Sequence, residues 1–330
     1  MSGIWFSDVG WAEAADPPVG IDHHRPTTRS GVSPSQLVLP NNPAARLPST
    51  ILEYLSGRFT HIGADVWQQR MLQGAVTDER GHPIRPATPF EPGLRIYYFR
   101  DLPQETRIPF DAVVVYRDEH LVVVDKPHFL PVMPSGKYLQ ETVLVRLKNE
   151  LGLDDLVPIH RIDRDTAGLV LFSVNRRSRD AYHALFRERQ VDKTYHAIAP
   201  WNPDLAWPIR RATRIGASGH FMQQTEKPGE PNAITDIRPL AVWGSRALYE
   251  LKPVSGQRHQ LRVHMNALGL PILNDGIYPE LTPEGTPDPA QPLQLLAQRI
   301  AFVDPLSLQP CEFVSARQLH LGTMNSDTPA

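Results

Sequence analysis

The stretch DAVVVYRDEHLVVVDKP, residues 111–127, contains two runs of β-branched residues on either side of a polar turn at Asp118 and Glu119. β-Branched residues suit a pleated, half-buried surface, and a short polar turn between two such runs is typical of an antiparallel hairpin. Farther along, strand-like and helix-like segments follow one another without the regular alternation of a parallel sheet. The later predicted elements are strands at 169–174, 194–199 and 246–252 and a helix at 176–189. We therefore predict an α+β domain with a central, mostly antiparallel mixed sheet flanked by helices and loops.

The chain ahead of this domain contains two segments that differ in composition and in hydrophobic periodicity. Its first 45 residues are rich in Pro, Gly and Ser and show neither helical nor strand periodicity, so we expect a mobile or extended arm. Between Ser49 and Gly74, apolar residues recur at near-helical spacing with an interruption around Gly63, which predicts two short helices ahead of a strand at 94–99. The predicted organisation is an arm at 1–45, a small α+β accessory domain at 46–105, the main domain at 106–320 and a tail at 321–330.

Composition narrows the class of protein. In a chain of 330 residues, 41% are hydrophobic and 21% are charged, as in ordinary globular proteins. No apolar run approaches the roughly 18 residues of a membrane-spanning helix, and the N-terminus lacks a secretory signal, so we expect a cytoplasmic protein without a membrane partner. A monomer is the default expectation, since no sequence pattern bears on the oligomeric state. The single cysteine, Cys311, excludes an intramolecular disulfide and a cysteine-based zinc cluster. The net charge of -2 gives no overall attraction to nucleic acid, so RNA affinity must come from local patches such as the arginines of 176–189.

The strongest local pattern is HRIDRDTAGL at 160–169, a polar turn that runs directly into an apolar strand. Such a turn can hold a carboxylate at the rim of a rigid sheet. Arg161 and Arg164 flank Asp163, and nearby positive charge favours the ionised form of a carboxyl, so we expect a lowered pKa for Asp163. On the residues alone, a surface turn with local arginine–aspartate pairs is the simpler explanation of the pattern. A kinase catalytic loop does not fit, because Ile162 breaks its H-R-D spacing.

Two further segments carry candidate functional residues. GQRHQLRVHM at 256–265 predicts a helix that ends at a glycine, with Arg258 and Arg262 on one face at i, i+4 spacing. KTYHA at 193–197 predicts a strand with Lys193 and Tyr195 on one side, where the tyrosine could stack on a base. The alternatives are an ordinary amphipathic helix with a basic face and a half-buried sheet tyrosine.

Taken together, these segments resemble the RluA-type pseudouridine synthases over about 113–319. The resemblance rests on segments in the order VVVYRDEHLVVVDKP, HRIDRDTAGLVLF, KTYHAI, AITD, SGQRHQLRVHM, ALGLPILND with Tyr278, and LQLLAQRIAFVDP. It implies the pseudouridine synthase fold, with Asp163 as the catalytic aspartate and Arg262 as its ion-pair partner. It also implies that Tyr195 is a catalytic residue that contacts the flipped uracil and is a candidate for proton removal, and that Arg161 enters the RNA stack. The basic residues Arg164, Lys193 and Arg258, taken from the segments themselves, are further candidate RNA contacts.

The reaction implied by this resemblance has simple requirements. Uridine becomes pseudouridine when the N1 glycosidic bond breaks, the uracil turns, and C5 joins C1′, with no oxidation and no external group. No cofactor or metal is therefore expected. A carboxylate beneath the sugar can bond to C1′ or remove a 2′ proton, and either route uses one aspartate rather than a carboxylate pair.

The expected partner is structured RNA, with ribosomal RNA favoured over transfer RNA. Residues 46–105 weakly resemble a small RNA-binding domain named after a small-subunit ribosomal protein, and such an appended unit suits a large substrate. The alternative reading of 46–105 is an extension that only packs on the main domain. The alternative to the enzyme as a whole is a non-catalytic RNA-binding or ribosome-assembly factor, for which Asp163 would be dispensable.

Overall fold

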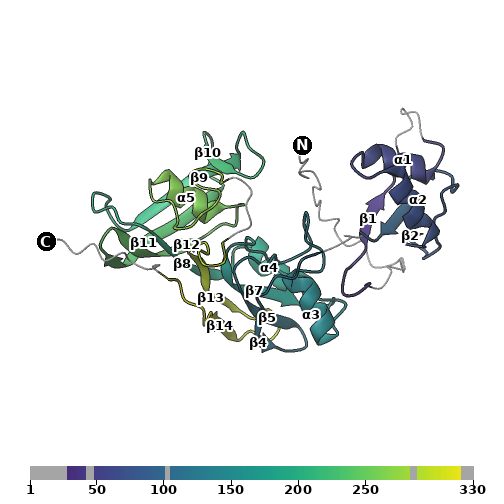
Figure 1. Cartoon of the computed structure of the whole chain (residues 1–330). Helices are drawn as coiled ribbons and strands as arrows, with labels where there is room; N and C mark the ends of the chain where they lie inside the picture. The colour runs from purple at the N-terminus through teal and green to yellow at the C-terminus, as the bar shows by residue number, and fades with distance from the viewer. Residues whose placement is uncertain (1–27, 42–47, 101–104, 283–287, 321–330) are drawn as a thin grey trace. The chain divides into compact units, whose positions relative to one another are not determined.

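The computed structural model describes residues 28–41, 48–100, 105–282 and 288–320. The chain divides into two compact units, Met1–Glu105 and Thr106–Ala330 (Figure 1). Within the described residues, no helix has both the length and the apolar character needed to cross a membrane.

The first unit packs two short helices against a three-stranded antiparallel sheet of order β1-β3-β2. Its elements are β1 Ser35–Val38, α1 Ile51–Arg58, α2 Ala64–Leu72, β2 Val76–Asp78 and β3 Arg95–Tyr98. The two helices predicted on either side of Gly63 are present, and Thr50 begins the first by accepting a 3.1 Å hydrogen bond from the backbone N–H of Glu53. The buried side chains of Leu55, Trp67 and Met71 form part of the core.

The expectation of an arm through residue 45 is wrong for part of that range. Ser35–Val38 forms β1 and pairs antiparallel with β3, with Ser35 opposite Tyr98. The segment SQLV has alternating partial burial, but four residues are too few to produce a recognisable strand period beside the surrounding Pro and Ser residues. Residues 1–27 and the tail at 321–330 lie outside the described residues.

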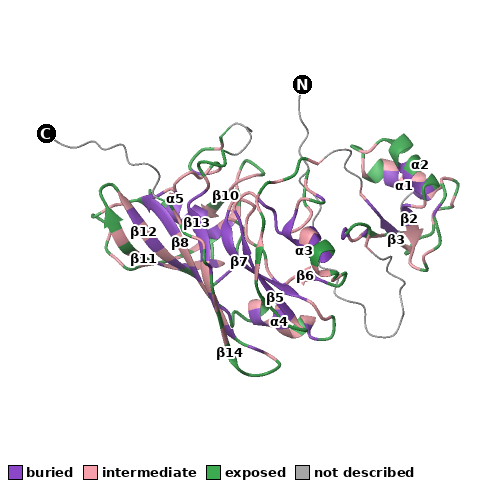
Figure 2. Cartoon of the chain, turned by 60° about the horizontal axis from the view of Figure 1, so that its bottom comes forward, coloured by how far each residue is buried: buried purple, intermediate pink, exposed green. Residues whose placement is uncertain are grey.

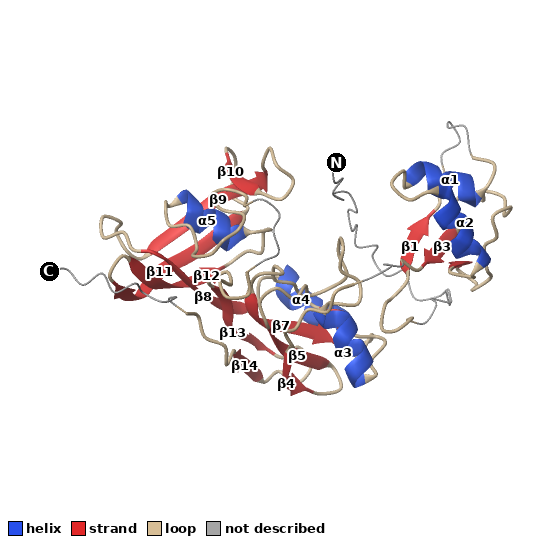
Figure 3. Cartoon of the chain, viewed as in Figure 1, coloured by secondary structure: helices blue, strands red, loops and turns tan. Residues whose placement is uncertain are grey.

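The second unit is built on one 11-stranded sheet (Figure 3). Nine of its strands follow the order β10-β9-β11-β12-β8-β13-β7-β5-β4, and the other two are β14, which pairs with β13, and β6, which pairs with β7. Its strands are β4 Val113–Arg117, β5 Leu121–Lys126, β6 Val157–Pro158, β7 Ala167–Ser173, β8 Asp192–Pro200, β9 Ile209–Ala217, β10 Gln224–Lys227, β11 Ala233–Trp243, β12 Arg246–Pro253, β13 Leu295–Val303 and β14 Pro310–Val314. Its helices are α3 Val143–Leu151, α4 Arg179–Arg187 and α5 Gln260–Ala267. The predicted hairpin is β4–β5, and the predicted α+β class with a mostly antiparallel mixed sheet is confirmed.

The alternation of side chains along β5 explains why helices cover both faces of this part of the sheet. Val122 and Val124 pack with α3, whereas Leu121 and Val123 pack with α4. Successive strand residues point to opposite faces, so a fully apolar strand needs a cover on each side. β5 and β7 are accordingly buried along their whole length (Figure 2). On the other half of the sheet, α5 packs Leu261 and Met265 against the strands.

The two halves of the sheet join where β13 runs parallel to β7, which is the one parallel pairing among the described strands. Gly168 pairs with Ala297 there and has φ of 109°, a backbone conformation that favours glycine. A Cβ atom on Gly168 would lie 2.3 Å from the backbone oxygen of Ala297. The glycine of the HRIDRDTAGL segment therefore allows β7 to approach β13 closely, immediately after the turn that carries Asp163.

Candidate active site

The loop that carries Asp163 connects β6 to β7 and rests on the buried side chain of Lys126. Lys126 Nζ donates hydrogen bonds of 2.9 Å each to the backbone oxygens of Pro127, Leu130 and Arg164. Burial lowers the pKa of this lysine to about 7. The Lys126 side chain therefore ties the backbone of the loop to the end of β5, which fixes the position from which the Asp163 side chain extends.

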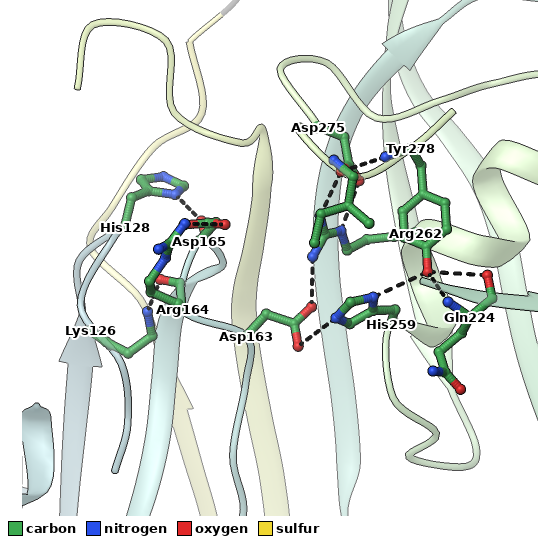
Figure 4. Close-up of polar contacts among 11 residues, drawn as sticks. Lys126, His128, Asp163, Arg164, Asp165, Gln224, His259, Arg262, Asp275 and Tyr278 are labelled. Carbon is green, nitrogen blue, oxygen red and sulfur yellow. Dashed lines mark hydrogen bonds and ion pairs between the residues drawn. The ribbon is translucent and has the colours of Figure 1, made fainter. Parts of the chain in front are cut away.

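The second carboxylate of the loop, Asp165, pairs with its chain neighbour. Arg164 Nε lies 2.8 Å from Asp165 Oδ1, and Arg164 Nη2 lies 3.2 Å from Oδ2 (Figure 4). His128 Nδ1 lies 2.7 Å from the backbone oxygen of Asp165. The expectation that Arg161 and Arg164 lower the pKa of Asp163 is wrong, because Arg164 is directed to Asp165 and the exposed Arg161 forms no hydrogen bond or ion pair among the described residues.

Asp163 instead contacts an arginine that lies 99 residues away in the chain. Arg262 Nη1 on α5 is 3.1 Å from Asp163 Oδ2. The other edge of the same guanidinium contacts both oxygens of Asp275, at 2.8 Å from Nε and 2.5 Å from Nη2. Asp275 Oδ1 also accepts hydrogen bonds from the backbone N–H groups of Ile277 and Tyr278. A carboxylate that binds two nitrogens of a guanidinium fixes the arginine in one orientation. Asp275 therefore holds Arg262 so that its Nη1 points at Asp163.

Burial and charge act on Asp163 in opposite directions. Burial raises the pKa of its carboxyl, but the positive charges of Arg262 and Arg258 and the hydrogen bond from Arg262 hold it below the ordinary value. Burial lowers the pKa of His259 to about 4, so this imidazole is neutral at pH 7 and the two arginines supply the positive charge. The Asp163 side chain is 31% exposed whereas Arg262 is 2% exposed, so an ionised carboxylate faces outward over a buried guanidinium.

His259 and Tyr278 continue the site on the other side of Asp163. His259 Nε2 lies 3.9 Å from Asp163 Oδ1, and His259 Nδ1 lies 3.1 Å from the Tyr278 hydroxyl. The hydroxyl also accepts a 2.7 Å hydrogen bond from the backbone N–H of Gln224 on β10 (Figure 4). The sequence reasoning did not single out His259, Asp275 or Tyr278 as functional residues. All three lie inside or just after the segments SGQRHQLRVHM and ALGLPILND, and this position within the family resemblance was the only indication in the sequence that they belong to the site.

Tyr195 and Lys193 both lie on β8, and Tyr195 interacts electrostatically with Asp163. Tyr195 and Lys193 line one small cavity, as expected for residues on the same side of β8. Burial, with a smaller contribution from the Asp163 charge, raises the pKa of Tyr195, so its phenol stays protonated at neutral pH. Lys193 Nζ donates a 3.2 Å hydrogen bond to the backbone oxygen of Ser255.

The placement of Arg258 and Arg262 on one helix face is wrong. α5 begins at Gln260, after His259 adopts a left-handed backbone with φ of 57°, so Arg258 precedes the helix. Periodicity located the helix but not the residue at which it starts. Arg258 is exposed, and its charge still contributes to the low pKa of Asp163.

A larger cavity of about 940 Å³ is lined by other residues of the second unit, among them His196, Trp243 and Arg317. Its lining includes neither Asp163 nor Arg262. His196 follows Tyr195 on β8, and consecutive strand residues point to opposite faces of a sheet. The cavity therefore does not belong to the site around Asp163.

Comparisons with known proteins identify the family to which the chain belongs. The sequence model of the family described as RNA pseudouridylate synthase matches residues 120–267, which include Asp163, Tyr195 and Arg262. An uncharacterized RNA pseudouridine synthase of Synechocystis is 31% identical over 233 residues, covering 69% of this chain and 79% of the relative. Two Vibrio cholerae proteins are also similar. The tRNA pseudouridine synthase C of this organism is 32% identical, and the match covers 60% of this chain and 87% of the relative. The ribosomal large subunit pseudouridine synthase C of the same organism is 30% identical, and the match covers 63% of this chain and 66% of the relative.

A solved structure gives the same fold. The human RNA pseudouridylate synthase domain containing 1 matches 65% of this chain and 86% of its own, with a TM-score of 0.53 and 21% sequence identity. The fold and the sequence relationships thus define an enzyme class, the isomerases that convert uridine to pseudouridine in RNA. The chain belongs to the RNA pseudouridine synthase family and is a synthase of the RluA type. This membership decides against a non-catalytic RNA-binding factor.

Proposed function

We propose that this enzyme isomerises uridine in ribosomal RNA and that Asp163 is its catalytic carboxylate. The observation that carries the proposal is the contact of 3.1 Å between Asp163 Oδ2 and a buried Arg262 whose other edge is held by Asp275. Arg262 holds one oxygen of the carboxylate, while the side chain as a whole remains partly exposed. The second oxygen, Oδ1, is then the atom that can reach a ribose.

The chemistry follows from this arrangement. Asp163 enters the reaction ionised, because the surrounding positive charge lowers its pKa. Its Oδ1 either bonds to C1′ or takes the 2′ proton as the N1 bond breaks, and the uracil then turns so that C5 faces C1′. As C5 bonds to C1′, the Asp163–C1′ bond breaks or the proton returns to C2′. C5 then loses its hydrogen as a proton and N1 gains a proton, so the product is an isomer of the substrate. Arg262 keeps Oδ2 in place through both steps, so the carboxylate does not have to reorient while the base is free.

The base must leave its stack before Asp163 can reach the sugar. Extruding a nucleotide costs a few kcal/mol, and an arginine that fills the gap offsets part of that cost. Arg161 is exposed in the same loop as Asp163, which supports this role for it. Tyr195 keeps a protonated phenol and is close enough to Asp163 for the carboxylate charge to raise its pKa, so it is suited to contact the turned uracil.

Three other basic residues complete the proposed RNA contacts. Arg258 is exposed, and its charge is felt at Asp163, so it lies near the path of the RNA backbone. The Lys193 ammonium donates one hydrogen bond to Ser255 and has two further donors for phosphate. Arg164 also has donor capacity beyond its contacts with Asp165 and Tyr138.

The choice of ribosomal RNA rests on the separate small unit ahead of the catalytic unit and on the relative named as a ribosomal large subunit synthase. An appended unit suits a large structured substrate, which is an argument from fold-level analogy. The relative named as a tRNA pseudouridine synthase supports transfer RNA as the second candidate.

One experiment tests both parts of this proposal. Pseudouridines are mapped across ribosomal and transfer RNA from cells with the gene, without it, and with only the Asp163→Asn form. We expect at least one ribosomal position to lose pseudouridine on deletion and to regain it with the wild-type form but not with Asp163→Asn. Loss confined to transfer RNA would overturn the target, and full recovery with Asp163→Asn would overturn the role of Asp163.

A further inference from the structure

His259 holds a particular place beside the catalytic carboxylate. Its Nε2 faces Asp163 Oδ1 at 3.9 Å, while Arg262 contacts Oδ2 at 3.1 Å. The two oxygens of Asp163 therefore have different neighbours, a full positive charge on one and an imidazole on the other. The His259 side chain is 7% exposed, and its ring meets the Tyr278 ring edge to face at 5.8 Å. The imidazole is thus fixed in position by packing.

The tautomer of His259 follows from its two neighbours. The Tyr278 hydroxyl has a single hydrogen, which it can donate to His259 Nδ1 at 3.1 Å or to the backbone oxygen of Gln224 at 3.2 Å. If it went to Gln224, Nδ1 would have to carry the imidazole hydrogen and the lone pair of Nε2 would face a negative carboxylate. Donation to Nδ1 instead places an N–H on Nε2, directed at Asp163, which is the electrostatically favoured arrangement.

We propose that His259 is a positioning residue of the isomerisation, held by Tyr278 as the Nε2–H tautomer so that it orients the Asp163 oxygen that reacts with the ribose. The inference rests on the proposed role of Asp163. At 3.9 Å the contact is longer than a hydrogen bond, and contacts of this kind tighten when the substrate is bound. A neutral donor restrains Oδ1 without neutralising it, whereas a second arginine there would compete with the substrate.

Two amide variants separate positioning from a structural role. The amide nitrogen of Gln reaches the place of Nε2, whereas that of Asn reaches only the place of Nδ1. His259 has φ of 57°, a region that Asn adopts more readily than most residues, so the backbone tolerates His259→Asn at least as well as His259→Gln. A purely structural role therefore predicts that the Asn variant is the more stable and the more active of the two.

The positioning role predicts the opposite order of activity. On unmodified ribosomal RNA, and on transfer RNA in parallel, we expect His259→Gln to keep kcat within about threefold of wild type. His259→Asn is expected to lower kcat by about tenfold to a hundredfold, since small misplacements of a reacting group have effects of this size. KM should stay within about twofold in both variants, and Tm measured by calorimetry should be no lower for Asn than for Gln.

A double-mutant cycle with Tyr278→Phe tests the tautomer. Phe keeps the ring and removes the hydroxyl, so kcat should fall in the wild-type background but change much less in the His259→Asn background. Equal kcat for wild type and His259→Asn, a more active Asn than Gln variant, or additive losses in the cycle would each overturn the inference alone. A wild-type enzyme that forms no pseudouridine in either RNA would overturn the proposed function as well.

Discussion

Asp163 and Asp165 lie two residues apart in one loop, yet their carboxylates pair with arginines of very different origin. Asp165 contacts Arg164, the preceding residue, and both side chains are partly exposed. Asp163 contacts Arg262, which comes from α5, is almost fully buried and is itself clamped by Asp275. The local pair shapes the loop, whereas the distant pair joins two separate segments of the chain into one site.

The difference between the pairs predicts how sensitive each of them is to mutation. A partly exposed pair between chain neighbours contributes about 0–1 kcal/mol to stability and is replaceable by water contacts. A buried guanidinium between two carboxylates cannot be solvated if a partner is lost, so its removal is far more damaging. Mutations in the two pairs should therefore have effects of different size and kind.

Apart from changes at Asp163 itself, the largest effect on activity is expected at Arg262. Arg262→Lys keeps a positive charge but cannot contact Asp163 and Asp275 with one planar fork. We expect kcat to fall by about a hundredfold or more, while the Kd for RNA changes less than about threefold, because Arg262 acts on Asp163 rather than on phosphate. Single-turnover rates and filter-binding measurements check this. Equal losses in rate and binding would show that Arg262 holds RNA backbone instead.

A large effect on stability is expected at Gly168, which joins the Asp163 loop to β13. Gly168→Ala places a Cβ against the backbone oxygen of Ala297 and forces alanine into a left-handed conformation. We expect a loss of about 2–4 kcal/mol in the free energy of unfolding, from strain and displaced backbone together. Urea unfolding measures it, with Gly256→Ala as the control, since a Cβ there meets no atom within 4 Å. Similar losses in both variants would contradict the close-approach explanation.

A smaller effect is expected at the local pair. Arg164→Gln removes the contact with Asp165 but leaves the backbone oxygen of Arg164 bonded to Lys126. Stability should fall by about 1 kcal/mol or less, and kcat should stay within about fivefold of wild type. A loss of activity as large as that of Arg262→Lys would remove the distinction between the two pairs.

The smallest change is expected in the response to pH. Asp163 has a lowered pKa and is ionised above the ordinary carboxyl range, while the raised pKa of Tyr195 keeps its phenol protonated. Because neither group titrates in between, neither should make kcat depend on pH from about pH 5 to pH 9. The buried Lys126, with a pKa of about 7, titrates within this range and acts only through the position of the loop, so we expect at most a shallow change near pH 7. A rate that rises tenfold per pH unit over this range would indicate a phenolate base, which this arrangement of charges disfavours.

The sequence predicted those parts of the molecule that depend on local patterns. Alternating β-branched runs located β4 and β5, and the break at Gly63 separated α1 from α2. Local charge, however, led to a wrong cause for the low pKa of Asp163. Arg164 lies beside it in the chain, but side-chain direction sends the guanidinium to Asp165.

The contacts that form the site are long-range, and no local pattern contains them. Asp163 and Arg262 are 99 residues apart, and their pairing was expected only through the family resemblance. Asp275 and Lys126 escaped notice because a single acidic or basic residue after an apolar stretch has no periodicity to mark it. Their roles follow only once β7 and β13 are side by side and α5 is packed on the sheet.

The most direct measurement is the single-turnover rate of pseudouridine formation by purified Asp163→Asn and Asp165→Asn, compared with wild type. The two substitutions make the same chemical change two residues apart in one loop. If Asp163 supplies the reacting oxygen, its Asn form should lose at least about a thousandfold in rate, and Asp165→Asn should lose less than about tenfold. Comparable rates for the two variants would contradict the assignment of Asp163 as the catalytic carboxylate.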